Sequence, residues 1–335
     1  MSARGPDGEA EREQSEQGRE AAAQRGEAER SRSSLHLEFT KMHGAGNDFI
    51  VLDGIRHSLP PIAPLAARLC DRHFGIGADQ LLVVRPSGSA DFRMEIYNAD
   101  GSQVEMCANG IRCFFQYLRD RGHTAKEEIG VETPAGVVHP RWAGPGRVRV
   151  QMGSPILEPA KIPTTLGSGS GPVLGALLDV DGEKLRVSSV SMGNPHAVIF
   201  VADPDQVPVE RLGPLVESHP AFPNRVNVEF ATPVSRQRIR QRTWERGTGE
   251  TLACGSGACA VAVVSMLEGR VDREVVVELR GGELEITWPG QEAPVYMTGP
   301  TAEVFTGSIR LGEAAEQGRE AAAQRGAAER SRPGG

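Results

Sequence analysis

The stretch Glu245 to Ala260, ERGTGETLACGSGACA, places a polar, glycine-punctuated loop directly before Cys254 and an apolar helical pattern directly after it. A second copy of this order lies upstream in Asn98 to Cys113, NADGSQVEMCANGIRC, where Cys107 takes the same place. In both stretches a polar residue precedes the cysteine by nine positions, and a glycine follows it by three. The repetition predicts two matched half-sites that face each other.

The similarity between the two halves of the chain extends beyond the cysteines. MHGAGNDFIV, starting at Met42, resembles MGNPHAVIFV, starting at Met192: each is a Gly/Asn turn followed by an apolar strand. Glu132, Gly136 and Trp142 recur at the same intervals as Glu278, Gly282 and Trp288. Three matches in one order indicate an internal duplication.

Each half has a strand pattern before its cysteine. Met94 and Ile96 alternate with polar residues, and Asn98 continues on their face. In the second half Ile239, Gln241, Thr243 and Glu245 are likewise spaced two residues apart, so they would lie on one face of a strand. Period-two alternation of this kind is typical of a half-buried strand.

Each half has a helix pattern after its cysteine. Ile111, Phe114, Phe115 and Leu118 fall at helical spacing, and the run AVAVVSML after Cys259 is apolar on all sides. A helix that is apolar all round is buried all round. The sequence therefore predicts an α+β fold with two pseudo-symmetric domains, each a curled, mostly antiparallel, barrel-like sheet around a central helix.

The two ends of the chain differ from this globular part. Residues 1–35 and 313–335 are polar, low-complexity tails that we predict to be disordered, because neither has an apolar face to bury. The string at Glu16–Arg32 returns at Glu316–Arg332 with one difference, Glu27 against Ala327. The first half is expected at residues 36–153 and the second at 154–298, joined near a Gly/Ser/Pro-rich linker.

Composition limits the functions open to a chain of 335 residues with net charge −7. No basic field suited to nucleic acid is present, so a small-molecule partner is expected. The apolar runs are too short to span a bilayer and no secretory signal is visible, which predicts a cytoplasmic protein without a membrane partner. The five cysteines match neither a disulfide framework nor a zinc site, so no metal is expected.

Cys107 and Cys254 each stand at the start of a helix pattern. Free backbone N–H groups and the helix dipole at that position favour a thiolate. The small residues that follow each cysteine let a ligand carboxylate approach the backbone. A buried, inert thiol is the alternative, and it is the reading we give Cys70, Cys113 and Cys259.

Two thiols on opposite faces of one carbon suit stereoinversion: one removes a proton and the other supplies one. A single cysteine nucleophile with a histidine base would need only one half-site and would leave the duplication unexplained.

The segments HGAGNDF, GIGADQLL, EMCANGIRC, GNPHAV, NRVNVEF and ERGTGETLACGSGACA together resemble the diaminopimelate epimerase family from about His36 to Gly312. The resemblance implies the family's two-domain fold, with the last strand, 299–312, returning to the first domain. It also implies cofactor-independent conversion of LL- to meso-diaminopimelate, a step toward lysine and peptidoglycan precursors, with a homodimer as one option for assembly.

The resemblance further implies roles for individual residues. Cys107 and Cys254 would be the acid/base pair, and His196 and Glu245 would tune the protonation of these thiols. Substrate-binding groups would come from Asn47, Gln80, Asn98, Ala108, Asn109, Asn194, Asn227, Glu245, Arg246, Gly255 and Ser256. Ala108 stands where the family usually has glycine, which adds a methyl group at one edge of the site.

Two alternatives remain open from the sequence. A proline or hydroxyproline racemase-like enzyme would share the architecture, but it typically has histidine two residues after the first cysteine, where this chain has Asn109. An inactive amino-acid-binding or redox-sensing protein would keep the cleft without needing both thiols.

Overall fold

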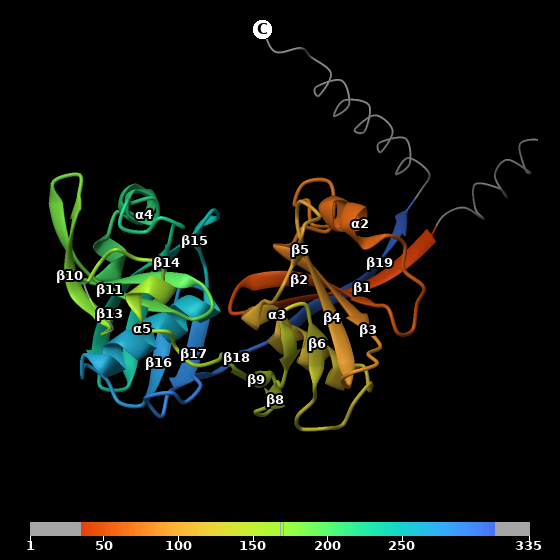
Figure 1. The fold of residues 1–335 in the computed structure, drawn as a ribbon. Coiled ribbons are helices and arrows are strands. Elements are labelled where there is room, and N and C mark those ends of the chain that lie inside the picture. The colour runs from red at the N-terminus through yellow and green to blue at the C-terminus, as the bar shows by residue number, and fades with distance from the viewer. Residues whose placement is uncertain (1–34, 168, 170, 312–335) are drawn as a thin grey trace, which may run out of the picture. The chain divides into compact units, whose positions relative to one another are not determined.

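The computed structural model describes residues 35–167, 169 and 171–311. The predicted tails therefore lie outside the described residues, apart from Leu35. By compactness, Thr40–Thr306 form one unit, and the described residues of Met1–Phe39 and Gly307–Gly335 belong to another. Hydrogen bonding divides the strands between two sheets, and the last strand, β19 (Ala302–Leu311), drawn in blue in Figure 1, joins the sheet that contains the first strand.

The smaller sheet has eight strands in the order β19-β1-β2-β3-β4-β6-β7, with β5 paired to β4. Its strands are β1 (Leu35–Gly44), β2 (Asn47–Asp53), β3 (Gln80–Arg85), β4 (Phe92–Asn98), β5 (Gln103–Val104), β6 (Val131–Thr133), β7 (Gly136–Val138) and β19 (Ala302–Leu311).

The larger sheet has eleven strands in the order β10-β11-β12-β13-β14-β16-β17-β18-β9-β8, with β15 paired to β14. Its strands are β8 (Arg141–Trp142), β9 (Arg147–Gln151), β10 (Val173–Val180), β11 (Glu183–Ser191), β12 (Pro195–Phe200), β13 (Asn227–Ser235), β14 (Arg238–Glu245), β15 (Gly249–Thr251), β16 (Glu274–Leu279), β17 (Gly282–Thr287) and β18 (Tyr296–Pro300).

The two sheets repeat one pattern of strand pairing. From β1 to β7 the successive pairs are antiparallel, parallel, antiparallel, parallel and antiparallel. From β11 to β17 the same five relations recur in the same order. A short extra strand pairs with the fourth strand in both, β5 with β4 and β15 with β14. The predicted internal duplication and the pseudo-symmetric α+β fold are confirmed.

The connections between the halves are made by strands. β8 and β9, which precede residue 153, extend the larger sheet through pairing of β9 with β18. β19, which follows residue 299, pairs with β1 at the edge of the smaller sheet. The domain boundaries at 36–153 and 154–298 stay a prediction.

Each half has one long helix directly after its cysteine. The helices among the described residues are α2 (Ile62–Leu69), α3 (Ala108–Asp120), α4 (Val209–Glu217) and α5 (Gly255–Leu267), with 3-10 turns η1 (Pro159–Lys161) and η2 (Pro204–Gln206). α3 packs against β2, β3, β4 and β9, and α5 packs against six strands of the larger sheet, β11 to β14, β16 and β17. Because neighbouring strands are about 4.8 Å apart, one helix touches six of them only when the sheet curls around it.

The burial of these helices follows their sequence patterns. In α5 every residue is buried except Ser256 and Leu267, as expected for a helix without a polar face. In α3 the predicted core residues Ile111, Phe114 and Phe115 are all fully buried. Both helices end before a glycine with positive φ, Gly122 at 71° and Gly269 at 69°, a conformation that favours glycine.

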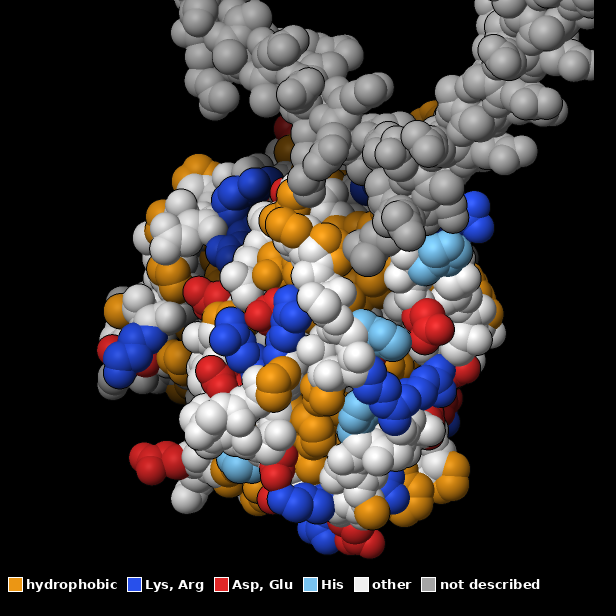
Figure 2. Space-filling model, turned by 90° about the vertical axis from the view of Figure 1, so that its right-hand side faces the viewer, with side chains coloured by type: hydrophobic (Ala, Val, Ile, Leu, Met, Phe, Trp, Pro, Cys, Tyr) orange, Lys and Arg blue, Asp and Glu red, His pale blue; other side chains and the backbone are white. Residues whose placement is uncertain are grey.

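The surface shows no strong charge field on the face drawn in Figure 2. Acidic, basic and hydrophobic side chains are interspersed there, in keeping with the modest net charge of −7. That face therefore offers no continuous basic surface for a nucleic-acid backbone. Among the described residues, no helix is long and apolar enough to cross a membrane.

Candidate active site

Cys107 is the N-cap residue of α3. Its backbone is extended, with φ −136° and ψ 118°, and its Sγ accepts a hydrogen bond from Gly110 N at 3.4 Å. The position predicted from the sequence is therefore correct. The expected preference for a thiolate is not: burial raises the pKa of Cys107, and the N–H groups of Gly110 and Asn109 lower it only in part. Desolvation of the charged form outweighs the helix N-terminus.

Cys254 takes the same place at the start of α5, with φ −114° and ψ 112°. Its Sγ lies 3.5 Å from Ser256 Oγ, and the residue is only 5% exposed. Burial raises the pKa of Cys254 well above its ordinary value, and the carboxylates of Glu245 and Glu229 raise it further. Glu245 also raises the pKa of Cys107, so its charge acts on both thiols.

The N-termini of the two helices meet. A Cβ added at Gly255, the first residue of α5, would lie 3.4 Å from the Cβ of Ala108, the first residue of α3. Asn109 Nδ2 donates to Ala253 O at 3.4 Å, which ties the start of α3 to the loop before Cys254. Within the described structure, the backbone N–H groups of Ala108, Gly255 and Ser256 form no hydrogen bond. These donors are therefore available to a ligand.

The methyl group of Ala108 packs in this contact. A Cβ at Gly255 would also lie 3.2 Å from Met297 Sδ, so the space between the helices is already filled. Alanine at position 108 is accommodated because glycine stands opposite it at position 255.

The polar residues of the first half form two hydrogen-bonded groups. Asn47 Oδ1 accepts from Cys107 Sγ at 3.7 Å and from Asn109 Nδ2 at 3.3 Å. Separately, Gln80 Nε2 donates to Asn98 Oδ1 at 2.9 Å, since Gln80 and Asn98 pair across β3 and β4. The first group contacts the thiol directly, and the second forms no hydrogen bond to either cysteine in the described structure.

In the second half His196 is enclosed by polar partners. It is 0% exposed, with Nδ1 2.7 Å from Glu229 Oε1 and Nε2 2.9 Å from Asn194 Oδ1. Burial raises the pKa of Glu229, while the charge and hydrogen bond of His196 lower it in part. A Cβ at Gly257, in the first turn of α5, would lie 2.8 Å from Glu229 Oε1 and 3.3 Å from Cys254 Cβ. The His196–Glu229 pair therefore lies directly beside the start of this helix.

Asn227 begins β13, Glu245 ends β14, and Arg246 follows it directly. Asn227 Nδ2 donates to Pro195 O at 3.0 Å, and its Oδ1 accepts from Arg246 N at 2.9 Å. Glu245 Oε1 accepts from Thr251 Oγ1 at 2.5 Å. The Arg246 side chain is exposed and bonds Asn224 O, so its contact with the group is through the backbone.

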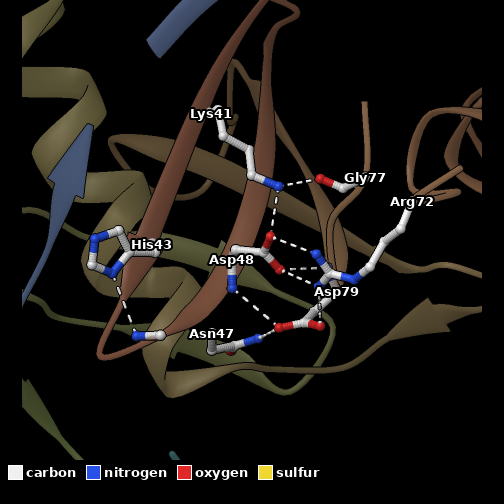
Figure 3. A network of polar contacts seen from close by, with 8 residues as sticks. Lys41, His43, Asn47, Asp48, Arg72, Gly77 and Asp79 are labelled. Atoms are coloured by element: carbon white, nitrogen blue, oxygen red, sulfur yellow. Dashed lines mark hydrogen bonds and ion pairs between the residues drawn. The ribbon is translucent and has the colours of Figure 1, made fainter. Parts of the chain in front are cut away.

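Sequence reasoning gave no role to Glu229 and Asp79. Glu229 lies two residues after Asn227 on β13 and therefore on the same face of the strand. This spacing could have indicated that Glu229 lies near the site. Asp79 accepts from Asn47 Nδ2 at 2.8 Å, as Figure 3 shows. Its partner lies 32 residues away, which no local pattern indicates.

The described residues contain no cluster of three or more His, Cys, Asp or Glu side chains that could hold a metal ion. Cys70, Cys113 and Cys259 are buried, and burial raises the pKa of each to about 12. These three thiols pack in the core, as expected.

The model of the Diaminopimelate epimerase family matches residues 39–158 and 188–304. The chain is 51% identical over 277 residues to the diaminopimelate epimerase of Aromatoleum aromaticum, covering 82% of this chain and 99% of the relative. It is also 51% identical over 280 residues to the diaminopimelate epimerase of Moorella thermoacetica, and the match covers 82% of this chain and 100% of the relative.

Solved structures share the fold at lower identity. A probable proline racemase from Agrobacterium radiobacter has TM-score 0.61 and 16% identity, covering 82% of this chain and 93% of its own. A Bacillus anthracis protein of the phenazine biosynthesis PhzF family has TM-score 0.60 and 16% identity, and the match covers 83% of this chain and 100% of that protein. At this identity the likeness concerns the fold alone, so it gives no support to a racemase of proline.

Proposed function

This chain belongs to the diaminopimelate epimerase family, and on that premise we propose that Cys107 and Cys254 are its acid/base pair. The enzyme is an isomerase of the racemase/epimerase class that converts LL-diaminopimelate to meso-diaminopimelate in lysine biosynthesis. The observation that carries the proposal is the meeting of α3 and α5 at Ala108 and Gly255, each directly after one cysteine.

The proposed reaction conserves protons and electrons. One cysteine, as thiolate, removes the proton from the α-carbon, and the electron pair of the C–H bond stays on carbon and spreads into the carboxylate. The other cysteine, as thiol, gives its proton to the opposite face of the same carbon. The first residue leaves the step as thiol and the second as thiolate, so each serves as base in one direction and acid in the other.

Burial has a chemical consequence for this step. A thiolate whose conjugate acid has a raised pKa is a stronger base, and the α-proton of an amino acid is weakly acidic. Since burial raises the pKa of both Cys107 and Cys254, each thiolate in the site is more basic than a solvated one.

The charge that develops on the substrate carboxylate needs donors fixed in advance. The backbone N–H groups of Ala108, Gly255 and Ser256 are candidates, because they point from helix N-termini and form no hydrogen bond in the described structure. We assign the remaining polar ends of the substrate to the other groups expected from the resemblance: Asn47, Gln80, Asn98, Asn109, Asn194, Asn227, Glu245 and Arg246.

His196 and Glu245 are proposed to tune the two thiols. Glu245 is supported by its electrostatic effect on both cysteines. His196 is supported by its pair with Glu229, which lies against the first turn of α5. Cofactor-independent chemistry, a cytoplasmic location and assembly as a homodimer remain proposals. Light scattering of the pure protein tests the last of these.

The test is deuterium incorporation in heavy water at low conversion. A thiol holds one exchangeable proton, so the product should acquire solvent deuterium at first turnover, while recovered substrate should carry almost none. Rapid labelling of unconverted substrate would indicate a single exchanging base.

Cys107→Ala and Cys254→Ala should each abolish epimerisation. Cys259→Ala is the matched control for Cys254, because it removes another buried thiol from the same helix. An active Cys254→Ala enzyme would show that the wrong residue has been assigned, and loss of activity in Cys259→Ala would show that packing of α5 explains the result.

A further inference from the structure

Asp48, the second residue of β2, and Asp79, directly before β3, stand at matching points of two parallel strands. β2 and β3 pair in parallel with Phe49 opposite Gln80, so the preceding aspartates lie side by side. Each carboxylate accepts the backbone N–H of the other: Asp48 N to Asp79 Oδ2 at 3.1 Å, and Asp79 N to Asp48 Oδ1 at 2.9 Å. The reciprocal bonds fix both side chains to the ends of the strands.

Two cations hold the pair in place (Figure 3). Arg72 Nη2 lies 2.8 Å from Asp48 Oδ1 and 2.7 Å from Asp79 Oδ1. Lys41 Nζ donates to Asp48 Oδ2 at 2.6 Å and also to Gly77 O. Asp79 therefore has Arg72 on Oδ1, while Oδ2 accepts from Asp48 N and Asn47 Nδ2. Both oxygens are engaged, so the carboxylate has a single arrangement.

The orientation of the Asn47 amide follows from this arrangement. An ionised carboxylate only accepts hydrogen bonds, so the Asn47 group that faces Asp79 must be the donor Nδ2. The amide oxygen is then turned the other way, where it accepts from Cys107 Sγ at 3.7 Å and from Asn109 Nδ2 at 3.3 Å. Asp79, which does not touch Cys107, and the donor Asn109 Nδ2 thus favour the same orientation, in which the oxygen of Asn47 meets the thiol.

We propose that Asp79 is a positioning residue, which fixes the Asn47 amide so that its oxygen faces Cys107 and Asn109. The proposal rests on the proposed function of Cys107 as acid and base. An oxygen acceptor holds the thiol proton and stabilises the protonated form, whereas a reversed amide would donate to sulfur and stabilise the thiolate. Asp79 acts through Asn47, and it sets the proton affinity of one of the two thiols.

Asp79→Asn tests this, because the new amide can offer either an oxygen or an NH2 group and releases Asn47 to turn. The measurement is the rate of iodoacetamide alkylation of Cys107 against pH in the full-length protein, followed by mass spectrometry of its peptide. The pH at which the alkylation rate of Cys107 is half its maximum, called the half-point below, should fall by roughly one pH unit, which is the effect of about one hydrogen bond to the thiolate. The other groups that act on Cys107 are the charges of Arg112 and Glu245 and the N–H donors of Asn109 and Gly110, and this variant keeps all of them.

Removal of a negative charge alone would also lower the half-point, so a second pair of variants separates the two causes. In an Asn47→Ala background the amide is absent, and adding Asp79→Asn should then shift the half-point no further. A shift of equal size in both backgrounds would overturn the proposal, as would no shift in the single variant. Asp79→Ser, which can also donate, replaces Asp79→Asn in the same comparison if that variant does not fold.

Activity provides the second readout. The catalytic efficiency kcat/KM of Asp79→Asn should fall about tenfold, the change expected for loss of one oriented hydrogen bond. Unchanged kcat/KM would contradict the proposal. The alkylation profile does not depend on turnover, so an active Cys107→Ala enzyme would refute the proposed function without deciding the role of Asp79.

Discussion

Two equivalent glycines, Gly110 and Gly257, should respond differently to alanine. Each lies three residues after its cysteine, in the first turn of α3 or α5. A Cβ at Gly257 would lie 2.8 Å from Glu229 Oε1 and 3.2 Å from Gln241 Nε2. The three atoms nearest to a Cβ at Gly110 would all be carbon atoms, the closest being Leu82 Cδ2 at 3.3 Å.

The magnitudes follow from what each methyl group must displace. Glu229 Oε1 belongs to a flexible side chain, but it is enclosed and lies 2.7 Å from His196 Nδ1, so moving it breaks a buried polar contact. Overpacking costs about 1–3 kcal/mol and a lost hydrogen bond to a charged group about 1.5–3, while better helix propensity returns up to about 1. Gly257→Ala should therefore lose about 2–5 kcal/mol of unfolding free energy. Gly110→Ala should stay within about 1 kcal/mol of the parent, because apolar neighbours yield by tenths of an ångström.

The assay is denaturant unfolding of both variants and the parent, followed by tryptophan fluorescence, with kcat/KM measured alongside. The slope of unfolding free energy against denaturant should be unchanged, so that the midpoints report stability directly. Equal losses in the two variants would refute the reasoning, because they would mean that any methyl group in the first turn is harmful. A Gly257→Ala protein as stable as the parent would show that Glu229 moves without cost.

Burial alone would raise the pKa of Asp48, but hydrogen bonds from Arg72 and Lys41 outweigh burial and hold this pKa well below its ordinary value of 3.8. The ionised carboxylate therefore stabilises the fold above pH 3.8, and this stabilisation is lost as the pH falls. The stability difference between parent and Asp48→Asn should accordingly shrink as the pH falls from about 5 toward 2, and a constant difference in urea midpoints would argue against it. Gly281→Ala should lower unfolding free energy by about 3 kcal/mol or more, because its Cβ would lie 2.0 Å from Ala45 O; an unchanged melting temperature would contradict that contact. Iodoacetamide should modify Cys107 before any other thiol, since it is more exposed than the other four cysteines, and peptide mapping that finds another residue first would show that exposure does not govern reactivity.

Much of the fold could be predicted because the signals were local and occurred twice. The alternation of Met94 and Ile96 gave β4, and the apolar run after Cys259 gave the buried helix α5. The sequence did not indicate that β9 pairs with β18, since strand partners are chosen by packing between distant segments.

The electrostatics of the site could not be read in the same way. The helix N-terminus predicted thiolates, and that interpretation was wrong because burial, which depends on the whole fold, is the larger effect on Cys107 and Cys254. Glu229 had no assigned role until its contact with His196 was seen.

The sequence by itself determined the chemistry that this protein offers: two cysteines at helix starts, small residues after them, and a duplication that places them in matched settings. Those features depend on spacing along the chain, which folding does not change. Only the tertiary structure decided that Ala108 meets Gly255 and that Asp79 orients Asn47 toward Cys107. These relations join residues far apart in sequence, and their strength depends on distance and desolvation, which exist only once the chain is packed.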